Sequence, residues 1–155
     1  MTTILIADDC ASIRELLRLE LEDEGYRVLV ARDGREAVEV FEAARPDLAI
    51  LDIWMPRGNG LEAAERIRAV DPAAPVILFT NHDETCIDDP RSIFAVACVE
   101  KGADLTELKQ VIVSVVNQRD GSPLFRRGLP PIRKHPAKVP GARFFSAVPR
   151  ISRNR

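Results

Sequence analysis

Cysteine is scarce in this sequence, and its three cysteines, Cys10, Cys86 and Cys98, lie far apart. No two of them form a Cys-x-x-Cys pair, and none belongs to a cluster with histidine. An odd number of widely spaced cysteines is not typical of a disulfide framework, and the ligand spacing of a zinc site is missing. The sequence therefore predicts reduced thiols and no structural zinc.

Long hydrophobic runs are also absent. The apolar start of the chain is followed at once by the acidic pair Asp8-Asp9, which does not fit a secretory signal. No run approaches the roughly 20 apolar residues that span a bilayer, and we find no internal repeat. These absences favour a cytoplasmic protein with no membrane contact. The 155 residues, 46% of them hydrophobic, are enough for one domain with its own core.

Negative charge is nearly absent from the end of the chain. Residues 119–155 contain ten basic residues, one acidic residue and six of the eleven prolines, whereas residues 1–118 contain 12 basic and 23 acidic residues. We therefore expect a folded acidic domain over 1–118 and a flexible, basic, proline-rich tail over 119–155. The tail has no base-reading fold, so the sequence favours solvent or an acidic protein partner over nucleic acid as its contact.

Short apolar runs alternate with amphipathic segments through residue 118. The runs that predict strands are 3–7, 27–31, 47–51, 76–80 and 95–99. Helices are expected from the capping pattern at Ser12–Glu15 up to Gly25, from Asp33 to Pro46, over 60–70 and over 105–118. Between 81 and 96 we expect only a short or irregular helix, begun by Asp88-Asp89-Pro90. This alternation predicts an α/β fold with a parallel sheet covered on both faces.

Polar residues stand at the carboxyl ends of four predicted strands. The first strand ends at Asp8-Asp9, the third at Asp52, the fourth at Thr80 and the fifth near Lys101. Because the carboxyl ends of parallel strands meet at one edge, these side chains should surround one crevice. Carboxylates held together repel each other, and Mg²⁺ would neutralise them. Such a pocket can accept a phosphoryl group on Asp52, while the metal and the ammonium group offset the charge of its oxygens. A Mg²⁺-dependent phosphohydrolase shares acidic strand ends, but it needs cap or substrate-binding elements for which this chain has no room.

These residues, together with the loop from Trp54 to Gly60, resemble the receiver domain of bacterial two-component response regulators of the single-domain, chemotaxis type. The resemblance covers about residues 3–118. It implies a flavodoxin-like, doubly wound, five-stranded parallel sheet of order 2-1-3-4-5 with helices on both faces. It also implies a phosphorelay regulator rather than an enzyme: Asp52 would accept a phosphoryl group from a histidine kinase or phosphotransfer protein, with self-catalysed transfer and hydrolysis.

The same resemblance implies a role for each site residue. Asp9 and Asp52 would bind Mg²⁺ directly, Asp8 through water, and Trp54 through its backbone carbonyl. Thr80 would donate a hydrogen bond to the acyl phosphate, and Lys101 would pair with Asp52 before phosphorylation and with a phosphate oxygen afterwards. Gly58 and Gly60 are expected to supply backbone conformations that larger residues resist.

The output implied by the sequence is protein–protein contact with an unknown downstream partner. The 37 residues after position 118 hold no helix-turn-helix or winged-helix pattern, so the usual DNA-binding output domain is not expected there. The chain is expected to be a monomer or a weak homodimer.

Three residues depart from the family pattern. Gly102 follows the lysine where proline is usual, and we predict a trans peptide bond there, because a cis bond without proline costs about 2.5–4 kcal/mol. Cys98 stands where an aromatic residue usually couples to the threonine, and Asn81 stands where a small residue is usual. These departures leave two alternatives open. One is a degenerate receiver that acts as a phosphorylation-independent interaction module, and the other is a nucleic-acid-associated regulator that acts through the tail.

Overall fold

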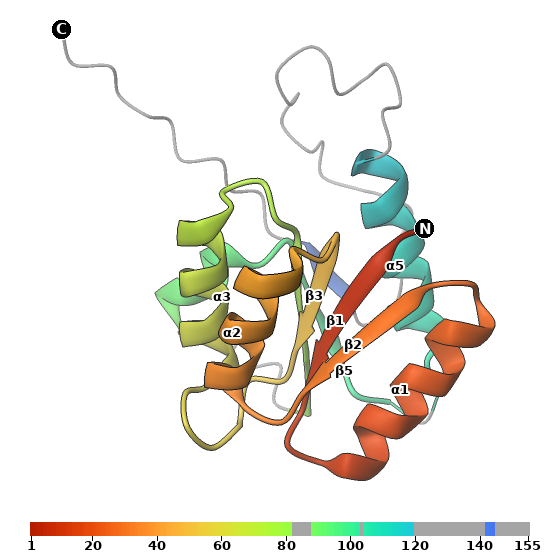
Figure 1. Cartoon of the computed structure of the whole chain (residues 1–155), viewed down its shortest axis with the longest axis horizontal. Coiled ribbons are helices and arrows are strands. Elements are labelled where there is room, and N and C mark those ends of the chain that lie inside the picture. Colours follow the sequence, from red (N-terminus) through yellow and green to blue (C-terminus); the bar gives the residue numbers. More distant parts are fainter. Residues whose placement is uncertain (82–87, 103, 120–141, 145–155) are drawn as a thin grey trace, which may run out of the picture.

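A single twisted sheet forms the centre of the molecule (Figure 1). The computed structural model describes residues 1–81, 88–102, 104–119 and 142–144. Within them the strand order is β2-β1-β3-β4-β5-β6, and the first five strands are parallel. The predicted order 2-1-3-4-5 is therefore confirmed. The strands are β1 (Thr3–Ala7), β2 (Arg27–Ala31), β3 (Leu48–Leu51), β4 (Val76–Thr80), β5 (Ala97–Glu100) and β6 (Ala142–Phe144).

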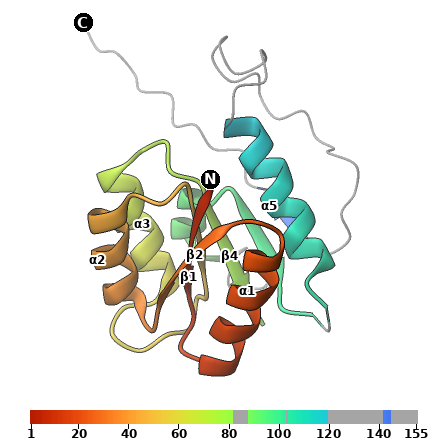
Figure 2. The same ribbon diagram turned by 45° about the vertical axis from the view of Figure 1, so that its right-hand side comes forward.

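Helices cover both faces of the sheet, as Figures 1 and 2 show. One hydrophobic cluster joins the sheet to α2 and α3, and a second cluster on the opposite face joins it to α1 and α5. The helical elements are α1 (Ala11–Asp23), α2 (Gly34–Ala44), α3 (Gly60–Val70), the 3₁₀ helix η1 (Pro90–Phe94) and α5 (Thr106–Arg119). None of the helices in the described ranges is long and apolar enough to cross a membrane.

The central strands are apolar on both sides because both sides are buried. In β1, Leu5 belongs to the cluster under α2 and α3, whereas Ile4 and Ile6 belong to the cluster under α1 and α5, and all three are fully buried. Successive side chains of a strand point to opposite faces, so a continuous apolar run serves both layers. This is why the short apolar runs of the sequence predict the strands well.

The start of α1 differs from the prediction. The helix begins at Ala11, its N-cap is Cys10 without a side-chain cap, and Ser12 lies inside the first turn, so the predicted capping box at Ser12 is wrong. The chain is held just before the helix in another way, because the Cys10 N–H donates to Asp8 Oδ1 over 2.8 Å. A carboxylate of the site thus fixes the residue before the helix, without capping the first turn.

The start of α2 agrees with the prediction. The Asp33 side chain accepts a hydrogen bond from the Glu36 N–H over 2.8 Å, as the capping pattern requires. The helix ends at Arg45, which takes the left-handed conformation with φ 47° directly before Pro46.

The segment before β5 is the least regular described part of the domain. Asp89 caps η1 by accepting from the Arg91 N–H, and the Ala95 N–H closes the turn on the Ser92 carbonyl. This turn moves the start of the fifth strand to Ala97, two residues later than predicted. The 3₁₀ helix η1 is the short helix expected after Asp88-Asp89, and residues 82–87 of the same segment lie outside the described residues.

Two further expectations concern the cysteines and the tail. Cys98 is disulfide-bonded and Cys10 is a free, exposed thiol, so the prediction of reduced thiols is wrong at Cys98. Separation along the sequence does not limit which cysteines the fold brings together. The predicted flexibility of residues 119–155 falls, apart from Arg119 and β6, on residues outside the described ranges. The short strand β6 has no counterpart in the prediction.

Candidate functional site

Three carboxylates meet at the carboxyl ends of β1 and β3. Asp8 and Asp9 directly follow β1, and Asp52 directly follows β3. The Asp52 N–H donates to the Ala7 carbonyl over 2.8 Å, which ties the two strand ends together. One carboxylate oxygen from each of the three aspartates lies within 4.8 Å of the others. The grouping predicted from the strand ends is therefore present.

Lys101 bridges two of these carboxylates from the end of β5. Its Nζ lies 2.6 Å from Asp8 Oδ2 and 3.2 Å from Asp52 Oδ2. The backbone positions it, because the Lys101 N–H donates to the Thr80 carbonyl at the end of β4 over 2.9 Å. The ammonium also lies 5.8 Å from the centre of the Phe79 ring. The resemblance implied the contact with Asp52, whereas the shorter contact with Asp8 was not expected.

The ion pairs are largely removed from water. The side chains of Asp8, Asp52 and Lys101 are 2%, 8% and 10% exposed. Burial raises the pKa of Asp52, and the charge of Asp8 adds to this rise, against the opposing effects of Lys101 and the Trp54 N–H. The pKa of Lys101 is also raised: burial lowers it, but the contacts with Asp8 and Asp52 outweigh burial. One ammonium therefore contacts two of the three clustered carboxylates, and the cluster carries an excess of negative charge.

This donor set fits a divalent cation. Carboxylate oxygens are the ligands that Mg²⁺ prefers, and one or two carboxylates with waters are enough for its octahedral shell. Asp8 and Asp52 are buried, whereas Asp9 is exposed, so one side of the cluster is open to water. The Trp54 backbone N–H donates to the Asp52 carboxylate, which fixes the Trp54 peptide beside the site while the indole side chain stays 57% exposed. The role of its carbonyl as a metal ligand stays a prediction.

Thr80 lies at the end of β4, next to β5. Its side chain is fully buried, and its carbonyl accepts the Lys101 N–H. Two of the residues that depart from the family pattern lie nearby. The peptide bond between Lys101 and Gly102 is trans, as predicted, and Cys98 is buried in β5. The effect of Cys98 and Asn81 on switching stays a prediction.

The loop after Asp52 folds back tightly on the site. Gly58 has φ 94°, a conformation that favours glycine, as expected. Gly60 is needed for a different reason than expected: its φ is not positive, but a Cβ there would lie 1.9 Å from the Asp52 carbonyl oxygen. The Gly60 N–H also donates to the Ile53 carbonyl over 2.9 Å. The first turn of α3 therefore touches the backbone of Asp52 itself.

Replacement of Gly60 by Ala is expected to lower the free energy of unfolding by about 3 kcal/mol, because the added methyl group forces the backbone of α3 away from Asp52. Urea denaturation measures this loss. Gly102→Ala is the matched control, because its Cβ would come no closer than 3.9 Å to Asp104 O. Equal stability of the two variants would contradict the close contact.

Sequence reasoning missed the residues of α2 that hold this loop. Arg57 Nη2 lies 2.9 Å from Asp33 Oδ2, and the Gly34 N–H donates to the Gly58 carbonyl over 3.1 Å. A Cβ at Gly34 would lie 2.1 Å from that carbonyl oxygen. The sequence signal for Asp33 was its helix-capping pattern, which does not reveal that the same carboxylate also binds the loop.

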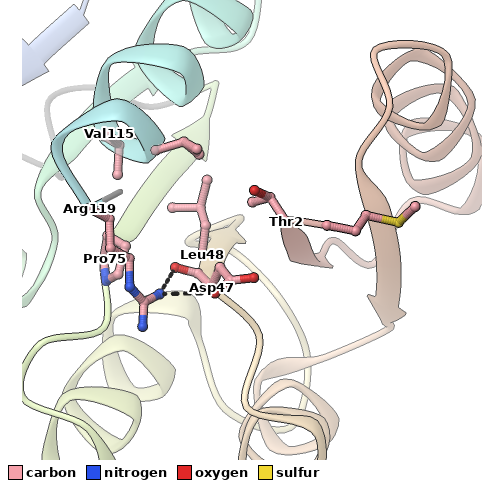
Figure 3. A pocket seen from close by; sticks show the side chains of 8 residues that line it. Thr2, Asp47, Leu48, Pro75, Val115 and Arg119 are labelled. Atoms are coloured by element: carbon pink, nitrogen blue, oxygen red, sulfur yellow. Dashed lines mark hydrogen bonds and ion pairs between the residues drawn. The ribbon is translucent and has the colours of Figure 1, made fainter. Parts of the chain in front are cut away.

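A cavity of about 330 Å³ lies away from Asp8, Asp9 and Asp52, at the amino ends of β1 and β3 (Figure 3). Arg119, at the end of α5, donates there to the Asp47 carbonyl, and its guanidinium lies 3.8 Å from the Asp47 carboxylate. Asp47 Oδ2 also accepts the Thr3 N–H over 2.8 Å. These contacts join α5 to the sheet, so we assign this end of the molecule a structural role.

Comparison with known proteins gives one consistent family. The model of the response regulator receiver domain matches residues 4–113. Response regulator MprA of Mycolicibacterium vanbaalenii is 41% identical over 80 residues, which are 52% of this chain and 35% of that protein. The chain thus spans about a third of the length of the curated relatives it matches.

Solved structures agree in fold over the whole length of the neighbours. Response regulator protein TrrA from Thermotoga maritima, in complex with Mg²⁺-BeF, superposes with a TM-score of 0.72 and 40% identity, covering 74% of this chain and 99% of that chain. TrrA in complex with histidine kinase ThkA superposes with a TM-score of 0.70 and 40% identity, covering 75% and 99%.

Proposed function

The chain belongs to the response regulator receiver domain family, and from this membership and the aspartate cluster we propose that Asp52 is a phosphoacceptor in a phosphorelay. The phosphodonor is a histidine kinase or a phosphotransfer protein. The proposal includes a cytoplasmic location and output through protein contacts. The TrrA regulator, which this chain resembles at 40% identity, forms a complex with a histidine kinase, and this supports the choice of donor.

The observation that carries the proposal is the placement of Lys101 against Asp8 and Asp52, at 2.6 and 3.2 Å. A structural ion pair needs one carboxylate for one ammonium, whereas here one ammonium contacts two carboxylates and a third lies beside them. The excess negative charge suits a site that binds a cation and then receives a phosphoryl group.

Each residue has a defined task in the proposed transfer. An Asp52 carboxylate oxygen attacks the phosphorus of the donor, the new O–P bond forms the acyl phosphate, and the N–P bond to the donor imidazole breaks. Asp9, Asp52 and the Trp54 carbonyl would hold Mg²⁺ directly and Asp8 would hold it through water, and the ion would offset the charge on the transferred oxygens. Lys101 moves from the Asp52 carboxylate to a phosphate oxygen, and the Thr80 hydroxyl donates to another. The chain itself catalyses both this transfer and the later hydrolysis.

The test is incubation of the full chain with acetyl phosphate, with Mg²⁺ or with EDTA, followed by intact-mass spectrometry. We expect a mass gain of one phosphoryl group with Mg²⁺ and none with EDTA. The label should be lost at alkaline pH, as an acyl phosphate is. A label that forms equally without Mg²⁺ would contradict the role of the aspartate cluster.

A second candidate is a receiver that binds partners without phosphorylation. The disulfide bond at Cys98 favours it, because this position in the family usually carries the aromatic side chain that couples to the threonine. The absence of any mass gain with Mg²⁺ and acetyl phosphate would favour this candidate over the phosphoacceptor.

A further inference from the structure

The outer edge of β5 is covered by a segment of the chain's own tail. Without β6, β5 would be the last strand of the sheet and would present unpaired N–H and C=O groups to solvent. In the structure β6 pairs with it in antiparallel register, with Ala97 opposite Phe144, Cys98 opposite Arg143 and Val99 opposite Ala142. Residues 142–144 thus lie against a domain whose last helix ends at Arg119.

The direction of the β5 amides identifies which groups β6 covers. The Lys101 N–H donates to the Thr80 carbonyl of β4. Because groups along a strand alternate between its two sides, the N–H groups of Ala97 and Val99 also face β4, and the Cys98 N–H faces away from β4 and toward β6. The partner of Cys98 in the register is Arg143. This pair is therefore the one that exchanges hydrogen bonds in the antiparallel ladder.

The charge distribution favours this arrangement within one chain. Residues 119–155 carry ten basic residues and one acidic residue, whereas residues 1–118 carry 12 basic and 23 acidic residues. Opposite charges attract the tail to its own domain at a high local concentration, since the two are covalently joined. β6 also contacts α5, so it lies against the helical layer as well as the strand.

We propose that the outer edge of β5 is a strand-binding site and that residues 142–144 of the same chain are its occupant. The paired tail closes this edge to strand addition by a second chain. The proposal goes beyond the phosphoacceptor role and does not depend on it, because it rests only on the pairing of β5 with β6.

Hydrogen exchange of the full-length chain, followed by NMR amide by amide, tests this proposal. Arg143→Pro removes an N–H that faces β5 and should speed the exchange of the Cys98 N–H at least about tenfold. Ala142→Pro is the matched control: the N–H it removes faces away from β5, and edge strands accept proline there. The N–H groups of Ala97 and Val99 face β4 and should exchange at the same rate in all three chains.

Each outcome decides the proposal. Slow exchange of the Cys98 N–H in the wild-type and Ala142→Pro chains, with fast exchange in Arg143→Pro, supports it. Fast exchange of this amide in the wild-type chain, or unchanged exchange in Arg143→Pro, would overturn it. Protection that disappears on dilution of the wild-type chain would mean that a second copy supplies the strand, and this would overturn the assignment to the same chain.

Discussion

We expect the Asp52→Asn variant to take up no phosphoryl group from acetyl phosphate in the presence of Mg²⁺, whereas the wild-type chain should gain one. Asparagine has nearly the shape of aspartate and can still accept the Trp54 N–H, but its amide is not a nucleophile toward phosphorus. Burial raises the pKa of the Asp52 carboxyl group because it disfavours the charged form. The fold should therefore tolerate a neutral side chain at this position. Intact-mass spectrometry measures the label, and circular dichroism checks that the variant is folded.

Two controls separate the acceptor from its surroundings. Asp23→Asn changes an exposed aspartate at the end of α1 and should label like the wild type. Asp9→Asn keeps the acceptor but removes one proposed metal ligand, so it should require more Mg²⁺ for the same labelling. A full label on the Asp52→Asn chain would show that another residue is the acceptor.

The sequence predicted the sheet because its signal is local. A strand such as Leu48–Leu51 that is buried on both faces needs an unbroken apolar run, and the run is visible without knowledge of its neighbours. The same holds for the gathering of Asp8, Asp9 and Asp52, because in a parallel sheet the strand ends share one edge. Strand order itself came from the family resemblance, not from the runs.

The errors occur where specific hydrogen bonds and close contacts decide the structure. The start of α1 follows the contact of Cys10 with the carboxylate of Asp8, and the shifted start of β5 depends on the turn closed by Ala95 and Ser92. The close approach of Gly60 to Asp52 is likewise a contact between the start of α3 and the end of β3. None of these contacts leaves a periodic pattern in the sequence.

β6 was missed for a related reason. A three-residue strand within a segment rich in proline and basic residues has too few residues to show alternation. Its pairing depends on the free edge of β5, which is a property of the folded sheet. The domain boundary expected near residue 118 is close to the end of α5 at Arg119, but the independence of the two parts stays a prediction.

Replacement of Lys101 by Met is expected to lower the free energy of unfolding by about 3–5 kcal/mol in the absence of Mg²⁺, because it leaves the buried carboxylates of Asp8 and Asp52 without their counter-charge. Methionine is long enough to fill the space of the lysine side chain, so the loss reports mainly on charge. Urea denaturation measures it. Lys109→Met is the matched control: this lysine pairs with Glu20 and Glu24 but is more exposed, at 28%, and its loss should cost less than about 1 kcal/mol.

Two further measurements identify the cause of the Lys101 effect. The double variant Lys101→Met/Asp52→Asn should be more stable than Lys101→Met alone, since it removes one of the two uncompensated charges. Mg²⁺ should raise the melting temperature of Lys101→Met more than that of the wild type, because a cation bound to the folded state replaces the missing ammonium. If the double variant were no more stable and Mg²⁺ had no greater effect, the loss would come from packing, and the electrostatic account of the aspartate cluster would be wrong.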